Sequence, residues 1–209
     1  MGATQTTPAN ASTPATLARR RSYHVGNVRS QLSQAASALL ESEGPAALSL
    51  RAIARRTGVA LGTVYYHYAD KQALLGGLAV DGFRDLGQAI RTAVDSRTAS
   101  GLRASGLAYL GFVQDRPALY GLMYETRETG RRDEVVQAEA AACAEMHRAI
   151  AMDFEPGVAR EQVRQVTQAI WCCARGIAAL ALARGAGGRM ETATVDEAVR
   201  GLEILMTRR

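Results

Sequence analysis

Cysteine and histidine, the residue types that most often bind metals or act as nucleophiles, are scarce in this chain, which has three of each. Cys143 and His147 are four residues apart, so on a helix they share one face, whereas Cys172 and Cys173 belong to a later segment. This spacing allows a Cys/His metal site or a thiol sensor. It also fits buried cysteines and a hydrogen-bonded histidine, which is the commoner arrangement.

Patterns typical of catalysis are missing from the sequence. There is no Glu-x-x-His pair of metal ligands, no glycine-rich phosphate loop, and no nucleophile paired with a base. We therefore expect a protein that is not an enzyme and that holds no cofactor or resident metal.

The excess positive charge lies entirely in residues 1–75. That segment has eight basic and three acidic residues, while residues 76–209 have 17 of each sign, so the formal net charge of +5 belongs to the first segment alone. A concentration of basic residues on one module is what phosphate binding requires. The N-terminal part is therefore the candidate for contact with nucleic acid.

The stretch SLRAIARRTGVALGTVYYHYADKQALL, residues 49–75, predicts two short helices, a tight turn, and the start of a third helix. Gly58 suits the left-handed conformation that a sharp helix end requires. The first helix should bury the stripe Leu50, Ile53 and Ala54. This arrangement is that of a helix-turn-helix.

The second short helix has an inward and an outward face. Val64 and Tyr68, four residues apart, should point inward. Thr63, Tyr66 and His67 should point outward. Asp70 is placed to cap the third helix, with Lys71 just inside it.

Three segments carry a family resemblance: SLRAIARRTGV (49–59), GTVYYHY (62–68), and Asp70-Lys71 followed by Leu74-Leu75. Together they resemble the DNA-binding signature of TetR-family transcriptional regulators. One position departs from the family pattern, because Ala60 stands where Ser or Thr usually precedes the recognition helix. We therefore expect that helix to lack a side-chain cap.

The resemblance implies roles for nine residues. Arg51, Leu61, Gly62 and Thr63 would meet base edges. Ser49, Tyr65, Tyr66, His67 and Lys71, the only lysine in the chain, would hold phosphates. The spacing of Leu61 from Val64 and Tyr68 also fits an inward side chain.

Composition indicates an all-α protein: aromatic residues make up 5% of the chain, alanine, leucine and glycine are abundant, and no long β-branched alternation occurs. We expect a DNA-binding domain at residues 25–75, whose first helix spans about 25–42, and a larger ligand-binding and dimerisation domain at 76–209. A helix over about 71–94 should link the two.

Residues 1–24 are rich in Thr, Ala, Ser and Pro, contain no acidic residue, and end near Arg19-Arg20-Arg21. We expect this segment to be disordered. It fits a basic arm for a minor groove, a solvated tail, or, less well before a bacterial-type regulator, a transit peptide. No stretch reaches the roughly 18 apolar residues of a membrane span, and the few cysteines suit a reducing compartment, so we expect a cytoplasmic protein without membrane contact.

The remaining sequence predicts further helices. A helix over 102–113, apolar nearly all round from Leu107 onward, should be buried. Pro117 should open a short helix through Tyr124. Longer helices should end near Met152, span about 158–183, and span about 195–206. The last should carry one apolar face, formed by Val195, Val199, Leu202, Leu205 and Met206.

WCCARG (171–176) and FVQDRPALYGLM (112–123) resemble the C-terminal domain of the TetR subgroup named for a Trp-His-Gly signature, with Arg175 in place of the histidine. Arg175 could pair with an anionic ligand or form an internal salt bridge. The candidate lining of a pocket for a mainly apolar small molecule is Phe112, Tyr120, Met123, Tyr124, Met146, Trp171 and Arg175. The same residues also fit an ordinary hydrophobic core.

The family resemblance implies that the last two helices form a four-helix dimer interface, although the stripe of the last helix could also pack inside the monomer. We therefore expect a homodimeric regulator, most simply a repressor, that leaves a pseudo-palindromic operator in double-stranded DNA when a small effector binds. The alternative is a helical small-molecule-binding protein whose helix-turn-helix no longer binds DNA.

Overall fold

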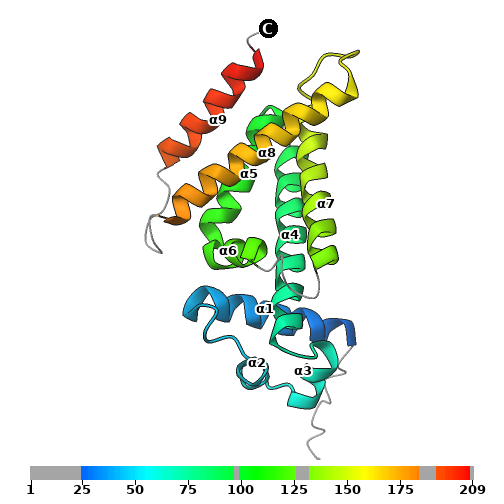
Figure 1. Cartoon of the computed structure of the whole chain (residues 1–209), viewed down its shortest axis with the longest axis vertical. Helices are drawn as coiled ribbons and strands as arrows, with labels where there is room; N and C mark the ends of the chain where they lie inside the picture. The colour runs from blue at the N-terminus through cyan, green and yellow to red at the C-terminus, as the bar shows by residue number, and fades with distance from the viewer. Residues whose placement is uncertain (1–24, 97–98, 126–131, 184–191, 208–209) are drawn as a thin grey trace, which may run out of the picture.

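The structure, a computed structural model, describes residues 25–96, 99–125, 132–183 and 192–207. Within those ranges the chain forms helices and no strands, which confirms the predicted all-α class. The tail over residues 1–24, with its possible basic arm, lies outside the described residues. The helices are α1 (Val25–Glu43), α2 (Leu50–Thr57), α3 (Leu61–His67), α4 (Lys71–Asp95), α5 (Gly101–Asp115), α6 (Pro117–Glu125), α7 (Arg132–Ala151), α8 (Arg160–Ala183) and α9 (Thr192–Thr207) (Figure 1).

The helices form two groups joined by α4 (Figure 1). The small group, α1 to α3, lies at one end of the molecule. In the larger group, α4 packs against α5, α6 and α7, and α8 and α9 pack on the outside. The helical segment that we predicted over residues 71–94 therefore runs from one group into the other.

The small group is held by a compact apolar core. Leu32 and Leu40 of α1, Ile53 of α2, Val64 of α3, and Tyr68 directly after α3 are all buried. Helix α1 buries one side: Val28, Leu32, Ala36, Leu39 and Leu40 are buried, and Ala35 is half-buried. Helical spacing of apolar residues placed these side chains correctly because each helix has only one neighbour-facing stripe.

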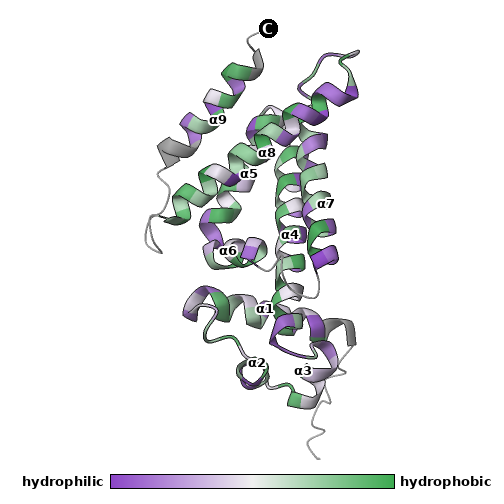
Figure 2. Ribbon diagram, in the orientation of Figure 1, coloured by the Kyte–Doolittle hydropathy of each residue, from purple (hydrophilic) through white to green (hydrophobic). Residues whose placement is uncertain are grey.

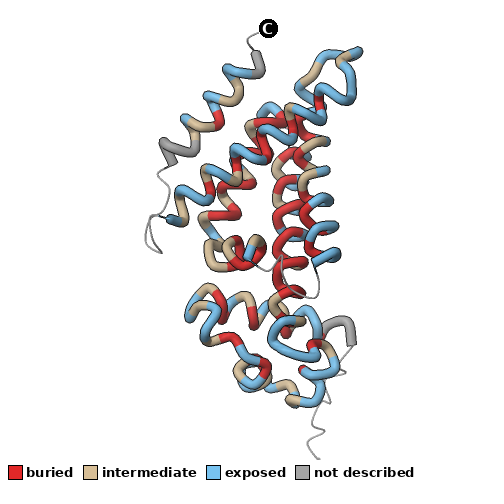
Figure 3. The backbone as a smooth tube through the Cα atoms, viewed as in Figure 1, coloured by how far each residue is buried: buried red, intermediate tan, exposed pale blue. Residues whose placement is uncertain are grey.

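Helix α4 begins with a side-chain cap and keeps one side buried along its length. The Asp70 carboxylate accepts a hydrogen bond from the Ala73 amide at 2.7 Å, as the sequence predicted. At about 1.5 Å per residue, its 25 residues span roughly 37 Å. Its buried side includes Leu74, Leu78, Phe83, Leu86, Ile90 and Val94 (Figure 3). The helix is therefore a stiff connection between the two groups.

Helix α5 is fixed at its start by two other parts of the chain. The Asp153 carboxylate accepts hydrogen bonds from the Gly101 and Leu102 amides, both at 2.7 Å. Arg103 forms salt bridges with Asp196 at 2.7 Å and Glu203 at 3.8 Å, which tie α5 to α9. These contacts place α9 along α5, so part of its surface packs within the subunit.

Some sequence expectations need correction. Leu107 is 37% exposed, so α5 is not buried on all sides. Helix α8 begins at Arg160 rather than near residue 158, since Gly157 has a φ of 105° and the chain is still turning there. Helix α9 starts earlier than expected, at Thr192.

Hydrophobic residues recur along both outer helices, α8 and α9 (Figure 2). Leu180 of α8 is 69% exposed, and Ile204 and Leu205 of α9 are exposed as well. By length and composition alone, α8 could cross a membrane, which our count of consecutive apolar residues did not anticipate. Of its most apolar 18-residue stretch, 33% is buried inside the molecule. Helices that pack in protein interiors pass the same test.

Candidate nucleic-acid interface and ligand-domain core

Helix α2 is capped at both ends by the residues that the sequence singled out. The Ser49 hydroxyl accepts a hydrogen bond from the Ala52 amide at 3.1 Å, and Gly58 adopts the left-handed conformation with a φ of 68°. Thr57 Oγ1 donates to the Ile53 carbonyl at 2.8 Å. Ser49 is thus the N-cap of α2. It is exposed at the start of the helix, where a phosphate could approach.

Helix α3 is anchored on one side and open on the other. Val64 and Tyr68 are buried, as predicted, and hold the helix against α1 and α2. On the opposite side, Tyr66 is 81% exposed and Tyr65 is exposed as well. With Val64 and Tyr68 buried, the helix exposes hydrogen-bond donors and aromatic rings to solvent.

The predicted DNA-binding residues lie on α2, on α3, at the cap before α2 and at the start of α4, and most of them are exposed. The exposed members are Ser49, Arg51, Gly62, Thr63, Tyr65, Tyr66 and Lys71. Leu61 and His67 are half-buried, and Leu61 packs against the core, as its inward-fitting spacing allowed. Leu61 is therefore less available for a base contact than its exposed neighbours Gly62 and Thr63.

Lys71 has a partner within the protein. Its Nζ donates a hydrogen bond to the Pro45 carbonyl at 3.0 Å, which connects the start of α4 to the segment between α1 and α2. The ammonium has two further N–H donors, and the side chain is exposed. Lys71 can therefore fix this segment and still meet a phosphate.

Arg55 was missing from our set of site residues. It follows Arg51 by four positions on α2 and is exposed, so the two guanidinium groups share one face of the helix. Arg56, also exposed, follows in the last turn. The four-residue spacing was the signal that could have identified Arg55 from the sequence.

Helix α3 starts without a side-chain cap, as expected from Ala60. The Ala60 carbonyl accepts from the Thr63 and Val64 amides at 2.9 and 3.2 Å, but its methyl group cannot satisfy the first amides of the helix. Without a side-chain cap, amides at the start of α3 that lack a partner in the helix can bond water or an oxygen of a ligand.

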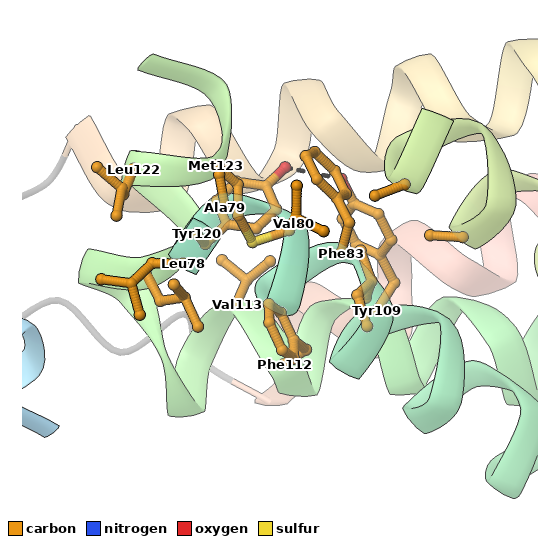
Figure 4. Close-up of a cluster of buried hydrophobic side chains, with 14 of the residues drawn as sticks. Leu78, Ala79, Val80, Phe83, Tyr109, Phe112, Val113, Tyr120, Leu122 and Met123 are labelled. Carbon is orange, nitrogen blue, oxygen red and sulfur yellow. Dashed lines mark hydrogen bonds between the residues drawn. The ribbon is translucent and has the colours of Figure 1, made fainter. Parts of the chain in front are cut away.

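In the larger group of helices, Phe112, Tyr120 and Met123 of the predicted ligand-lining set belong to a cluster of buried side chains from α4, α5 and α6 (Figure 4). Phe112, Tyr120, Met123, Met146 and Trp171 are buried, whereas Tyr124 and Arg175 are half-buried. Ring contacts connect Tyr120 and Tyr124 of α6 to Trp171 and Arg175 of α8, whereas the Phe112 ring lies 5.8 Å from the guanidinium carbon of Arg116.

Tyr109 of α5, which we did not predict as a site residue, is the centre of this region. Its hydroxyl lies 2.7 Å from that of Tyr120 and 3.3 Å from that of Tyr124. Its ring packs edge-on against Trp171, with 5.2 Å between centroids. We call Tyr109, Tyr120 and Tyr124 the tyrosine cluster. The four-residue spacing of Tyr120 and Tyr124 was visible in the sequence, but their common partner on another helix was not.

The tyrosine cluster holds its protons at neutral pH. Burial raises the pKa of the Tyr109 hydroxyl above its usual value, and its two tyrosine neighbours raise it further. Burial also raises the pKa values of Tyr120 and Tyr124. The three neutral hydroxyls can therefore each donate and accept hydrogen bonds in an apolar setting.

Arg175 makes two contacts at the edge of the tyrosine cluster. Its guanidinium carbon lies 4.1 Å from the centroid of the Tyr124 ring, a cation–π geometry. Its Nη1 lies 3.9 Å from Glu139 Oε1, at the long end of a salt bridge. Arg175 therefore has Glu139 as the internal salt-bridge partner that the sequence allowed. This one ion pair leaves most of its five N–H donors for other groups.

His147 has a hydrogen-bond partner on α8, and the three cysteines are free thiols, Cys143 half-buried and Cys172 and Cys173 exposed. His147 Nδ1 lies 3.1 Å from Thr167 Oγ1, and burial raises the pKa of the Cys143 thiol. Among the described residues, no group of three His, Cys, Asp or Glu side chains is arranged to hold a metal ion. These observations give the sensor interpretation no support.

A cleft of about 790 Å³ lies between the two groups of helices. It is lined by α1, by α4 from Leu78 to Asp85, and by the α5–α6 junction from Asp115 to Leu119. None of the residues that we predicted to line a ligand pocket borders it.

The small group of helices, with its exposed basic and aromatic face, defines a DNA-binding helix-turn-helix protein. Residues 32–78 match the family model for bacterial regulatory proteins of the tetR family, and residues 102–202 match that for a tetracyclin repressor-like C-terminal domain. The chain belongs to the TetR family of transcriptional regulators. It is therefore a DNA-binding regulator and not an enzyme, as the sequence predicted.

Several known proteins are similar to this chain. A protein of unknown function from Rhodococcus sp. RHA1 is 31% identical, with 89% of this chain and 96% of that one covered and a TM-score of 0.69. The fatty acid degradation regulator FadR from Bacillus halodurans shares the fold, with 17% identity, coverage of 83% and 93%, and a TM-score of 0.66.

Curated relatives match over a shorter stretch. The HTH-type transcriptional regulator Rv1816 of Mycobacterium tuberculosis is 35% identical over 89 residues, which is 41% of this chain and 38% of that protein. The chain thus matches well under half the length of this curated relative.

The missing cap of α3 predicts a stabilising substitution. Ala60→Ser supplies a hydroxyl for the first amides of the helix and should raise the free energy of unfolding by about 0.5–1 kcal/mol. Urea denaturation measures the change. Ala69→Ser, at an exposed position just before the cap of α4, is the control and should leave stability unchanged. Equal stability of Ala60→Ser and the unchanged chain would show that the amides of α3 gain nothing from a cap.

Proposed function

We propose that the protein is a homodimeric, ligand-responsive repressor of the cytoplasm. The observation that carries the proposal is the connection between α3 and α4. Helix α3 is held by the buried Val64 and Tyr68 and exposes hydrogen-bond donors on its other side. Helix α4 starts shortly after it and runs into the core that contains the tyrosine cluster. A change in that core can therefore move the DNA-binding surface as a rigid unit.

In this proposal, two copies of α3 enter successive major grooves of a pseudo-palindromic operator, with centres about 34–36 Å apart. Arg51, Gly62 and Thr63 face base edges, and arginine at guanine is the commonest specific pairing. Leu61 is the base contact that its half-buried position supports least. Ser49, Tyr65, Tyr66, His67 and Lys71 hold phosphates and set the register.

The effector that we propose is a small apolar or amphipathic molecule bound at the tyrosine cluster. Phe112, Met123 and Met146 supply apolar surface, and the tyrosine hydroxyls and Arg175 supply polar contacts. Arg175 stands at the place of the histidine in the Trp-His-Gly signature that the sequence resembles. Because these side chains pack against one another, an effector enters by displacing them.

That displacement provides the release mechanism. An effector binds the displaced packing better than the packed one, so it shifts the population toward the displaced state. If this state moves the two copies of α3 out of register with the operator, DNA and effector weaken each other's binding equally. A gel shift on the DNA upstream of the protein's own gene tests the proposal, and no specific shift at near-physiological salt would favour a helical ligand-binding protein instead.

The base-reading role of Arg51 makes a prediction about specificity. Arg51→Ala should cost about 1–3 kcal/mol at one base pair and relax the preference there. Competition binding with operator variants, each changed at a single base pair, measures this. Arg160→Ala removes the same charge from an exposed position at the start of α8 and should leave the preferences unchanged. Equal weakening of Arg51→Ala on every sequence would assign Arg51 to the phosphates.

The dimer in this proposal is formed by the outer faces of α8 and α9. Leu180, Ile204 and Leu205 are exposed there, although α9 also packs on α5 through Val199 and the Arg103 salt bridges. Exposed apolar side chains on the last two helices suit an interface with a second copy. The apolar composition of α8 is explained in the same way.

Leu180→Glu should therefore break the dimer. A carboxylate buried without a partner costs about 3–5 kcal/mol, and a two-fold interface contains it twice. Sedimentation equilibrium should show monomers at concentrations where the unchanged chain is dimeric, and operator affinity should fall with it. Val136→Glu, at a 46% exposed position on α7, is the matched control and should remain dimeric. A dimeric Leu180→Glu variant would remove α8 from the interface.

A further inference from the structure

Glu41, near the end of α1, reaches from the DNA-binding group of helices to the start of α6. Its Oε1 accepts a hydrogen bond from the Leu119 amide at 2.7 Å, and its Oε2 accepts one from the Ala118 amide at 3.1 Å. Both oxygens of one carboxylate are thus bonded to a helix 77 and 78 residues further along the chain. We call this pair of hydrogen bonds the Glu41 clasp.

The local chemistry favours a carboxylate at this point. Pro117 opens α6 and has no N–H, so the Ala118 and Leu119 amides are the first donors of the helix. Such donors have no partner within their own helix, and the start of a helix carries partial positive charge. A carboxylate satisfies both amides at once, and hydrogen bonds to an ionised acceptor are stronger than neutral ones.

Few other polar contacts join α1 to the larger group among the described residues. The Ser33 hydroxyl donates to Asp81 Oδ2 of α4 at 2.6 Å, and Asp81 also accepts from Arg84 at 3.3 Å. Beside these bonds, the cleft of about 790 Å³ separates α1 from α4 and the α5–α6 junction. The facing surfaces are therefore incompletely packed, and the Glu41 clasp has a large share in fixing their relative position.

Helix α6 also carries two members of the tyrosine cluster. Tyr120 follows the clasped Leu119 amide directly, and Tyr124 lies one turn later on the same nine-residue helix. A displacement of either tyrosine therefore moves the amides that Glu41 holds. The clasp connects the proposed effector core to α1 by a route that is separate from α4.

We infer that Glu41 is a positioning residue for DNA binding: its clasp on α6 sets the orientation of α1, and through α1 that of α2 and α3, for the operator. The inference rests on the proposed function, because it assumes that the protein binds an operator as a dimer. With the clasp intact, both copies of α3 keep a fixed spacing. Without it, each DNA-binding group samples more orientations, and operator binding must restrict them.

The test uses Glu41→Gln, which keeps the shape of the side chain but removes its charge and one acceptor oxygen. Operator affinity of the full-length dimer, without added effector, should fall about tenfold, within the range of typical coupling effects. The substitution makes the subunit more positive, so a simple charge effect would strengthen DNA binding. The slope of affinity against salt concentration should stay unchanged, because Glu41 itself meets no phosphate in this account.

Glu43→Gln is the matched control. Glu43 is exposed, lies two residues after Glu41 on α1, and its substitution changes the net charge identically. Its operator affinity should equal or slightly exceed that of the unchanged chain. A fall in affinity for Glu41→Gln alone therefore cannot arise from charge.

Amide hydrogen exchange gives a second readout that does not depend on DNA. The Ala118 and Leu119 amides should exchange faster in Glu41→Gln, while thermal unfolding of the whole chain remains close to that of the unchanged protein. If exchange is faster but operator affinity is unchanged, the positioning role is wrong. If neither changes, the clasp itself is wrong. If the unchanged protein shows no specific operator binding, the proposed function fails, and exchange still reports on the clasp.

Discussion

The continuous buried side of α4 is the constraint on which the rest of the structure depends. The helix starts at the Asp70 cap beside α3 and remains packed through Val94, deep in the larger group of helices. A helix buried along its whole length cannot bend without exposing apolar surface or breaking its hydrogen bonds. Any rearrangement of the aromatic core must therefore reach the DNA-binding helices either through α4 as a rigid body or through the contacts of α1 with α6.

In the proposed function, these two routes couple the effector core to the DNA-binding helices. Helix α4 would transmit movement along its axis, and the Glu41 clasp would set how the DNA-binding group sits on the larger one. The cleft between them leaves room for a small change of orientation. A regulator needs such a pair of packings that differ by only a few kcal/mol, because a ligand can shift an equilibrium only by its differential affinity for the two states.

The sequence predicted most of the fold and the helix ends of the DNA-binding group, because the signals there are local. Gly58, Asp70 and the Val64–Tyr68 pair each act within one turn of a helix, and each has the expected conformation or burial. Tyr109 and Glu41 escaped prediction because their partners lie on other helices, 11 to 78 residues away. Helical spacing shows which face is apolar, but not which polar group on a distant helix meets it.

Hydroxyl-radical footprinting on the DNA upstream of the protein's own gene tests the central claim most directly. The account predicts protection of two half-sites whose centres lie about 10–10.5 base pairs apart, or a multiple of that spacing, related by an approximate two-fold axis. The protection should persist at near-physiological salt. A uniform, sequence-independent protection that vanishes as salt is raised, or no protection at all, would contradict the claim that paired copies of α3 read an operator.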